Sequence, residues 1–218
     1  MNRASFLLPL LLALAGFQGA AQAQDAAAGQ KLIASCSGCH GIPGYQASFP
    51  EVHRVPMIAG QNARYIVAAL AAYKKGDRKH PTMRGAAGSM SDKDMADVAA
   101  FYEQQGRGGI KPVAERAAPP ASPAVAALLA KGACVSCHGA DFNKPIDGAY
   151  PKLAGQHADY LYVALKSYQI QGKEQVGRNN AVMVGIAKPY TLAELRVIAQ
   201  YLGSLPGELR TVPEPKFR

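Results

Sequence analysis

The five-residue stretch Cys36-Ser37-Gly38-Cys39-His40 occurs a second time as Cys134-Val135-Ser136-Cys137-His138, and the two copies use all four cysteines of the chain. A C-x-x-C-H run is typical of covalent haem attachment. Two thiols on one helical turn reach the two vinyl groups of a haem, while the next imidazole binds its iron. The sequence therefore predicts two covalently bound haem c groups. The predicted attachment residues are Cys36, Cys39, Cys134 and Cys137, and the predicted proximal iron ligands are His40 and His138.

Three other uses of the cysteines remain open at this point: a pair of zinc knuckles, a redox dithiol, or two structural disulfides. None of them gives a reason for a histidine directly after the second cysteine in both copies. Haem attachment explains the cysteines and the histidines together.

The first 23 residues have the features of a secretory signal peptide. Arg3 forms a weak basic n-region, an apolar run extends from Phe6 to Phe17, and Ala21-Gln22-Ala23 matches a small-residue cleavage site. A membrane anchor is the alternative. However, the apolar run is shorter than the roughly 20 residues that a spanning helix needs, and a proline and a glycine interrupt it. We therefore expect cleavage near Ala23 and export of the mature protein.

The chain is basic, with a formal net charge of +9, and loss of the signal peptide with its one charged residue, Arg3, leaves +8. This balance suggests an acidic docking partner or peripheral association with an anionic membrane, although it could equally serve solubility alone. We expect no nucleic-acid partner, because no nucleic-acid-binding signature accompanies the charge. A candidate docking patch, with an ordinary solvated helix end as its alternative, consists of Lys74, Lys75, Arg78 and Lys79.

The sequence divides into two repeated units joined by a linker. The stretch from Gly106 to Pro123 is rich in glycine and then in proline, and it has no apolar period, which indicates a linker. The predicted organisation is a signal peptide at 1–23, a first domain at 25–106, a linker at 107–122, a second domain at 123–205 and a C-terminal tail at 206–218.

Each unit is expected to be all-α, with about three helices wrapped by loops around a haem. Asp25 and the pair Ser122-Pro123 can begin the helices that run into the haem motifs. A middle helix follows in each unit, and its apolar stripe repeats at a spacing of 95 residues, starting at Tyr65 and Tyr160. Such a stripe has the period of an α-helix. These two tyrosines could line the haem pockets or the domain interface.

The last helix of each unit begins with a capping box, Ser91-x-x-Asp94 or Thr191-x-x-Glu194. The spacing between the two units is 98 residues at the haem motifs and 100 residues at the last helices. Insertions have therefore gone only into loops. Neither unit has the alternating pattern of a β-strand.

A second axial ligand is needed to fill the coordination of each iron, and the repeat identifies one candidate in each unit. Met183 is the only methionine of the second unit, and it precedes the last helix in what we expect to be a loop. Met83 lies 100 residues earlier in the same setting, and Arg78 and Arg178 match at that spacing. Methionine as the second ligand raises the potential of a haem and suits electron transfer. Met83 and Met183 are therefore the predicted distal ligands.

The three histidines outside the motifs are weaker candidates, because none of them is repeated. His53 falls in a stretch that the second unit lacks, His80 corresponds to Asn180, and His157 corresponds to Asn62. We expect them to be surface or pocket residues. His80 is of most interest, since it is close to a predicted distal ligand.

The mature chain resembles the dihaem cytochrome c4 family. The resemblance is carried by both C-x-x-C-H motifs, the stretch Tyr150-Pro151-Lys152-Leu153-Ala154-Gly155-Gln156, the run Met83-Arg84-Gly85 before Ser91-Asp92, and the region of Met183. It covers nearly all of residues 25–205. It implies two class I cytochrome c domains in tandem, related by a pseudo-twofold axis, with the haems facing one another and the propionates in the interface. It also implies the attachment, proximal and distal roles given above. A longer loop from Ile42 to Ile58 and the tail depart from the family.

Iron that carries both a histidine and a methionine has no position for a substrate, so we expect a one-electron carrier and not an enzyme. The resemblance implies a periplasmic respiratory chain, with a quinol-oxidising complex as donor and a terminal oxidase as acceptor. One alternative is a dihaem peroxidase-like oxidoreductase, which would need one haem with a displaceable ligand. Another is a binding or scaffold module with zinc in the cysteine sites.

Overall fold

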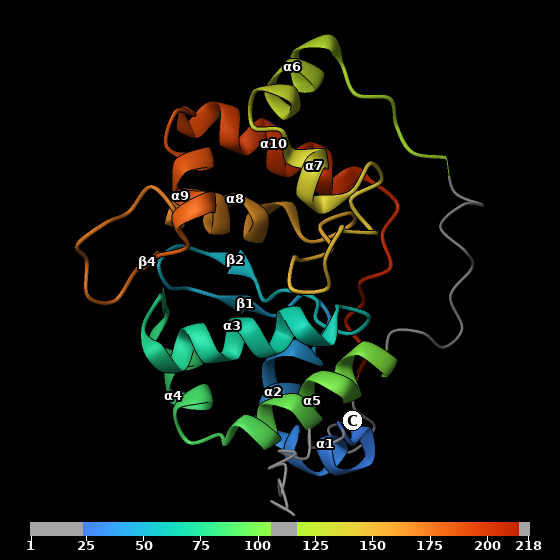
Figure 1. Ribbon diagram of the computed structural model, residues 1–218, viewed down its shortest axis with the longest axis vertical. Coiled ribbons are helices and arrows are strands. Elements are labelled where there is room, and N and C mark those ends of the chain that lie inside the picture. The colour runs from blue at the N-terminus through green and yellow to red at the C-terminus, as the bar shows by residue number, and fades with distance from the viewer. Residues whose placement is uncertain (1–23, 106–116, 214–218) are drawn as a thin grey trace, which may run out of the picture.

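The structure is a computed structural model that describes residues 24–105 and 117–213. The predicted signal peptide, part of the predicted linker and the last five residues of the tail lie outside these ranges. Figure 1 shows two helical halves stacked along the long axis, the first (blue to green) below and the second (yellow to red) above.

Each half of the described chain contains five helices. Those of the first half are α1 (Ala26–Leu32), α2 (Ala34–His40), α3 (Ala63–Lys75), α4 (Pro81–Gly88) and α5 (Asp92–Gln105). Those of the second half are α6 (Pro123–Lys131), α7 (Cys134–His138), α8 (Ala158–Ser167), α9 (Ala181–Ala187) and α10 (Leu192–Ser204). Four two-residue strands lie in the loops: β1 (Gln46–Ala47), β2 (His53–Arg54), β3 (Arg78–Lys79) and β4 (Gly177–Arg178). The all-α class is confirmed, although the sequence predicted no strands at all. Within the described ranges, no helix combines the length and apolar character that a membrane span requires.

Local capping chemistry sets the helix ends. The side chain of Asp25 accepts hydrogen bonds from two backbone N–H groups of α1, and that of Ser122 accepts one at the start of α6. These bonds satisfy N–H groups that have no partner inside the helix. Both predicted capping boxes are present as reciprocal bonds, between Ser91 and Asp94 and between Thr191 and Glu194.

The number of helices per half is five, so the expectation of about three was wrong. The helix that leads into each haem motif breaks in two, at Ile33 in the first half and around Ala133 in the second. A further short helix, α4 or α9, precedes the last one. These pieces are five to nine residues long, too short to display the apolar stripe that identifies the longer helices.

Each half has its own apolar core. In the first half α5 packs against α1 and α3, and the buried side chains include Leu70, Met95 and Val98. In the second half α10 packs against α8 and α6, and the buried side chains include Leu161 and Leu195. Burial of one such side chain contributes about 1.5–3 kcal/mol, so each cluster is a substantial stabilising unit.

The two halves meet through pairs of equivalent residues. Gln61 donates from Nε2 to the carbonyl oxygen of Lys152 (3.0 Å) and accepts from the N–H of the same residue (2.9 Å). Gln156 makes the same pair of bonds with Met57, at 2.8 and 3.0 Å. Gln156 follows Gln61 by 95 residues, and Lys152 follows Met57 by 95 residues. Such reciprocal contacts are expected when a pseudo-twofold axis relates the two halves, as the resemblance implied.

The longer loop of the first half, from Ile42 to Ile58, packs against the second half. Strands β1 and β2 form a small antiparallel hairpin within it. Arg54 forms an ion pair with Asp159 of α8 at 3.0 Å, and Glu51 forms one with Lys166 of α8 at 2.9 Å. Figure 1 shows this hairpin between α3 and α8. The loop therefore belongs to the interface between the halves.

The described end of the chain, residues 206–213, returns from the second half to the first, and we call it the C-terminal strap. The N–H of Arg210 donates to the carbonyl oxygen of Ala59 at 3.0 Å. Leu209 is buried, and Val212 packs against the core of the first half. The strap is thus part of the fold and connects both cores.

Replacing Gly29 with alanine is expected to destabilise the first half by about 1–3 kcal/mol, the usual cost of overpacking. Helix α1 crosses α5 so closely that a Cβ at Gly29 would lie 2.1 Å from the carbonyl oxygen of Asp97. The cost can be measured by denaturant unfolding of the haem-loaded protein. Gly88→Ala is the control, because no atom lies within 4 Å of a Cβ there. Equal effects of the two substitutions would contradict the close helix crossing.

Candidate haem centres

A continuous cavity of about 1000 Å³ runs through both halves of the described structure. Its walls include every residue that the sequence predicted to hold haem, namely Cys36, Cys39, His40, Met83, Cys134, Cys137, His138 and Met183. Cavities that hold one small molecule usually measure about 300–1000 Å³. This cavity lies at the upper end of that range, and both haem motifs open into it.

Short helices position the thiols. The two cysteines of each motif are three residues apart on α2 or α7, so both thiols lie on one helical face. All four are half-buried free thiols that line the cavity. Burial raises the pKa of the Cys36 and Cys134 thiols, so these remain neutral in the folded chain.

Backbone carbonyl oxygens orient the two motif histidines. Nδ1 of His40 lies 2.8 Å from the carbonyl oxygen of Pro56, and Nδ1 of His138 lies 3.1 Å from that of Pro151. A carbonyl oxygen can only accept, so each Nδ1 carries the proton and each Nε2 keeps its lone pair for a metal. Burial also lowers the pKa of both histidines, which favours the neutral imidazole that binds iron.

Sequence reasoning missed the two prolines that orient these histidines. Pro56 and Pro151 are 95 residues apart, the same spacing as the middle helices. This spacing could have identified them as an equivalent pair. Their role depends on a main-chain oxygen, however, and the residue type does not reveal it.

The two predicted distal methionines lie in helices and not in the loops that the sequence led us to expect. Met83 is in α4, and Met183 is in α9. Asn180 begins α9 by accepting a hydrogen bond from the N–H of Met183 at 3.0 Å. A helix of seven or eight residues fixes the direction of a side chain more firmly than an open loop does. Both methionines reach the same cavity as the motif histidines.

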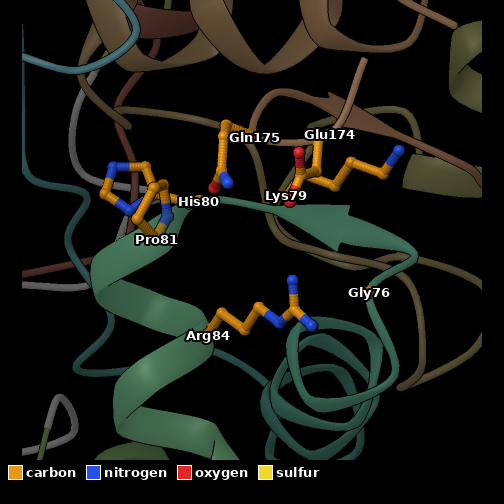
Figure 2. A pocket seen from close by; sticks show the side chains of 7 residues that line it. All are labelled: Gly76, Lys79, His80, Pro81, Arg84, Glu174 and Gln175. Carbon is orange, nitrogen blue, oxygen red and sulfur yellow. The ribbon is translucent and has the colours of Figure 1, made fainter. Parts of the chain in front are cut away.

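His80 also reaches this cavity, beside the first haem site. It precedes α4 as Asn180 precedes α9, but its side chain makes no capping bond. Its ring meets Phe49 edge-on, with 5.8 Å between ring centroids, and burial lowers its pKa. Figure 2 shows His80 beside Pro81 at a separate, smaller pocket of about 60 Å³.

The other two histidines have structural surroundings. His53 is buried in the cavity wall, and its ring stacks on Tyr160 with 6.2 Å between centroids. His157 begins α8 at the interface. Tyr65 and Tyr160 both line the cavity, one of the two positions that the sequence suggested for them.

One of the four basic residues of the candidate docking patch, Arg78, is buried, so the prediction was wrong for this residue. Arg78 is 8% exposed and lies in β3 at the interface between the halves. Lys75 pairs with Asp77 at 2.9 Å, and Nζ of Lys79 donates to the carbonyl oxygen of Lys173 in the other half. The sequence suggested an exposed docking patch, with a solvated helix end as the alternative, because it does not reveal which loops the second half covers.

Known proteins share this arrangement. The cytochrome c family profile matches residues 26–105 and 124–206. Cytochrome c4 of Azotobacter vinelandii is 33% identical, over 94% of this chain and 100% of that protein. The crystal structure of reduced recombinant cytochrome c4 from Pseudomonas stutzeri has a TM-score of 0.62 and 28% identity, covering 84% of this chain and 100% of that one.

A relative with another name aligns over a large part of the chain. It is the thiosulfate dehydrogenase electron acceptor of Stutzerimonas stutzeri, 29% identical over 78% of this chain and 79% of that protein. Since the family profile covers both halves and cytochrome c4 aligns over nearly the whole chain, this protein belongs to the cytochrome c4 family of dihaem electron carriers, with two covalently bound haem c groups.

Proposed function

We propose that this chain is a periplasmic one-electron carrier with two closed, six-coordinate haems. The first haem is attached to Cys36 and Cys39 and the second to Cys134 and Cys137. His40 and Met83 would bind the iron of the first haem, and His138 and Met183 would bind that of the second. The observation that carries this proposal is that all eight side chains line one cavity at equivalent places in two related halves.

Haem iron supplies reversible exchange of one electron. The protein's part is to hold the imidazole and the thioether and to exclude water. The bonds from Nδ1 of His40 and His138 to carbonyl oxygens keep both rings in one tautomer and one orientation. A methionine as the second ligand and an apolar surrounding both raise the reduction potential.

The same ligand set supports a carrier over an enzyme. A peroxidase-like oxidoreductase would need an iron with a displaceable ligand. The matched methionines would instead give each iron the same second ligand and leave neither iron with a free position. His80 is the residue that could create a difference between the halves, since its counterpart Asn180 is not a metal ligand.

The donor and acceptor are redox proteins, and we propose a quinol-oxidising complex and a terminal oxidase in these roles. The relative named as an electron acceptor of thiosulfate dehydrogenase supports a second donor, a dehydrogenase of that kind. The basic chain suits acidic docking surfaces or peripheral contact with an anionic membrane. Turnover with isolated complexes of each kind, measured with increasing salt, distinguishes these donors.

The ligand assignment predicts two covalent haems per chain, both low-spin in the ferric state and both slow to bind cyanide. A pyridine haemochrome assay gives the number of haems, and ferric spectra give the spin state. The double substitution Cys134→Ser/Cys137→Ser should leave one covalent haem, and Cys36→Ser/Cys39→Ser should leave the other. A high-spin haem or rapid reaction of one site with peroxide would favour the oxidoreductase instead.

A further inference from the structure

His80 occupies the same position as Asn180, but the two side chains have different surroundings. Asn180 begins α9, and its side chain accepts a hydrogen bond from the N–H of Met183. His80 begins α4, where its side chain makes no capping bond. The helix that carries Met83 therefore lacks the side-chain cap that fixes the start of its counterpart.

The ring of His80 is available to bind a metal. Its Nδ1 is buried and has no hydrogen-bond partner within residues 24–105 and 117–213. A buried polar group without a partner destabilises a fold, and such groups are rare. Burial lowers the pKa of His80 and outweighs the backbone of Phe49, which raises it. The imidazole is therefore neutral, and one of its nitrogens keeps a lone pair.

His80 lies beside the space for the first haem. It lines the large cavity together with His40 and Met83. Burial is the main cause that lowers the pKa of His40, and the nearby His80 lowers it further, so the two histidines are close enough to interact. Residues three apart along a helix lie on one face. This spacing brings His80, at the end of α4 shown in Figure 2, to the same side of the helix as Met83.

Helix α4 is only lightly anchored to the core. Ala87 is its one buried residue, and Pro81, Thr82 and Arg84 in its first turn are exposed. Segments with few buried contacts shift at a low cost in free energy. Because Met83 follows His80 by three residues, a shift of about 4.5 Å along the helix axis would bring one side chain to the place of the other.

We infer that His80 is a reserve ligand of the first iron, which binds in place of Met83 when that methionine leaves. The inference rests on the proposed function, since it takes Met83 as the ordinary ligand. In the exchange, the bond from Sδ of Met83 to iron breaks and a bond from the neutral imidazole of His80 forms. No proton or electron is transferred.

The reserve ligand makes the two halves unequal. Imidazole binds iron well, and an iron with two histidines has a lower potential than one with a histidine and a methionine. Without Met83, the first half therefore keeps a closed iron of lower potential. The second half has Asn180 at the equivalent position, which does not bind iron, so loss of Met183 leaves an open position there.

The test compares Met83→Ala with Met183→Ala in the haem-loaded protein. In Met83→Ala both ferric haems should stay low-spin and slow to bind cyanide, while one methionine–iron charge-transfer band is lost. The redox equilibrium of the first haem should change by at least about fiftyfold toward the ferric state, which is about 100 mV at 59 mV per tenfold. In Met183→Ala the second haem should become high-spin and bind cyanide rapidly.

Two double variants identify the residue that binds. Met83→Ala/His80→Asn gives the first half the asparagine that the second half has, and its first haem should be high-spin and open to cyanide. Met83→Ala/His53→Asn is the matched control, because His53 also lines the cavity. Nδ1 of His53 donates to the carbonyl oxygen of Glu51 at 2.8 Å, and the ring stacks on Tyr160. This control should stay low-spin.

The outcomes separate the reserve ligand from the proposed function. If Met83→Ala keeps both charge-transfer bands, Met83 is not a ligand and the proposed function fails in the first half. If one band is lost and the first haem becomes high-spin, Met83 stands as a ligand and the reserve ligand is refuted. A low-spin first haem in Met83→Ala/His80→Asn, or a high-spin one in Met83→Ala/His53→Asn, would also refute it. Met83→Leu, which keeps an apolar side chain without sulfur, carries the same comparisons if Met83→Ala does not mature.

Discussion

Replacing Met183 with histidine is expected to lower the reduction potential of one haem by more than about 100 mV, a small part of the roughly 0.8 V over which axial ligands set haem potentials. Met183 is the only methionine of the second half, so no other thioether there can replace it. Histidine keeps the iron six-coordinate but lacks the soft sulfur that favours ferrous iron. A redox titration that resolves both haems measures the change, and loss of one of two methionine–iron charge-transfer bands identifies the ligand.

The control for this prediction is Met90→Leu, because Met90 also lines the cavity but has no methionine counterpart in the second half. Leucine there should leave both charge-transfer bands in place. Met183→Ala should open one coordination position and allow cyanide to bind at that haem only. If Met183→His leaves both potentials and both bands unchanged, Met183 is not an iron ligand.

Repetition made the haem sites predictable from sequence. The C-x-x-C-H pattern identifies the cysteines and histidines directly, and the spacing of 100 residues selects Met83 and Met183 from six methionines. Both reach the cavity, although they do so from short helices that carry no periodic signal of their own. A site defined twice in one chain can be found by comparing the chain with itself.

Comparison of the two repeats could not predict the contacts between the halves. Arg78 read as an exposed charge because arginine is mostly found at surfaces, and its burial depends on Arg178 in a strand that only the folded chain brings near. Leu209 lies in a short segment between Pro206 and Pro213, so no helix or strand pattern predicts its burial. Arg78 and Arg178 are 100 residues apart in the sequence, and Arg210 of the strap pairs with Ala59, 151 residues earlier.

The C-terminal strap is the second place where a large effect is expected. Deleting residues 206–218 should lower the free energy of unfolding by at least about 3 kcal/mol, because truncation of a single buried leucine already costs about 2–5 kcal/mol. Leu209 is 2% exposed. Glu208 pairs with Lys152 at 2.7 Å, and the amide of Asn143 donates to the carbonyl oxygen of Pro206 at 3.0 Å. The deletion removes all of these contacts together.

The strap begins beside the core of the second half, where Leu205 is buried, and ends at the core of the first half with Val212. Its loss should therefore uncouple the halves as well as destabilise them. Calorimetry of the haem-loaded protein should change from one transition to two, since separate domains need not unfold together. Truncation after Pro213 is the control, because it keeps the whole strap, residues 206–213.

A point substitution in the strap tests whether its position matters when the chain keeps its full length. A Cβ at Gly207 would lie 1.8 Å from the carbonyl oxygen of Ala154, so Gly207→Ala cannot keep the strap in its present position. It should reproduce much of the effect of the deletion while leaving the chain complete. If Gly207→Ala and the deletion both leave the unfolding transition single and unshifted, the strap does not hold the halves together. In that case the paired contacts of Gln61 and Gln156 carry the interface, and their substitution should produce the second transition instead.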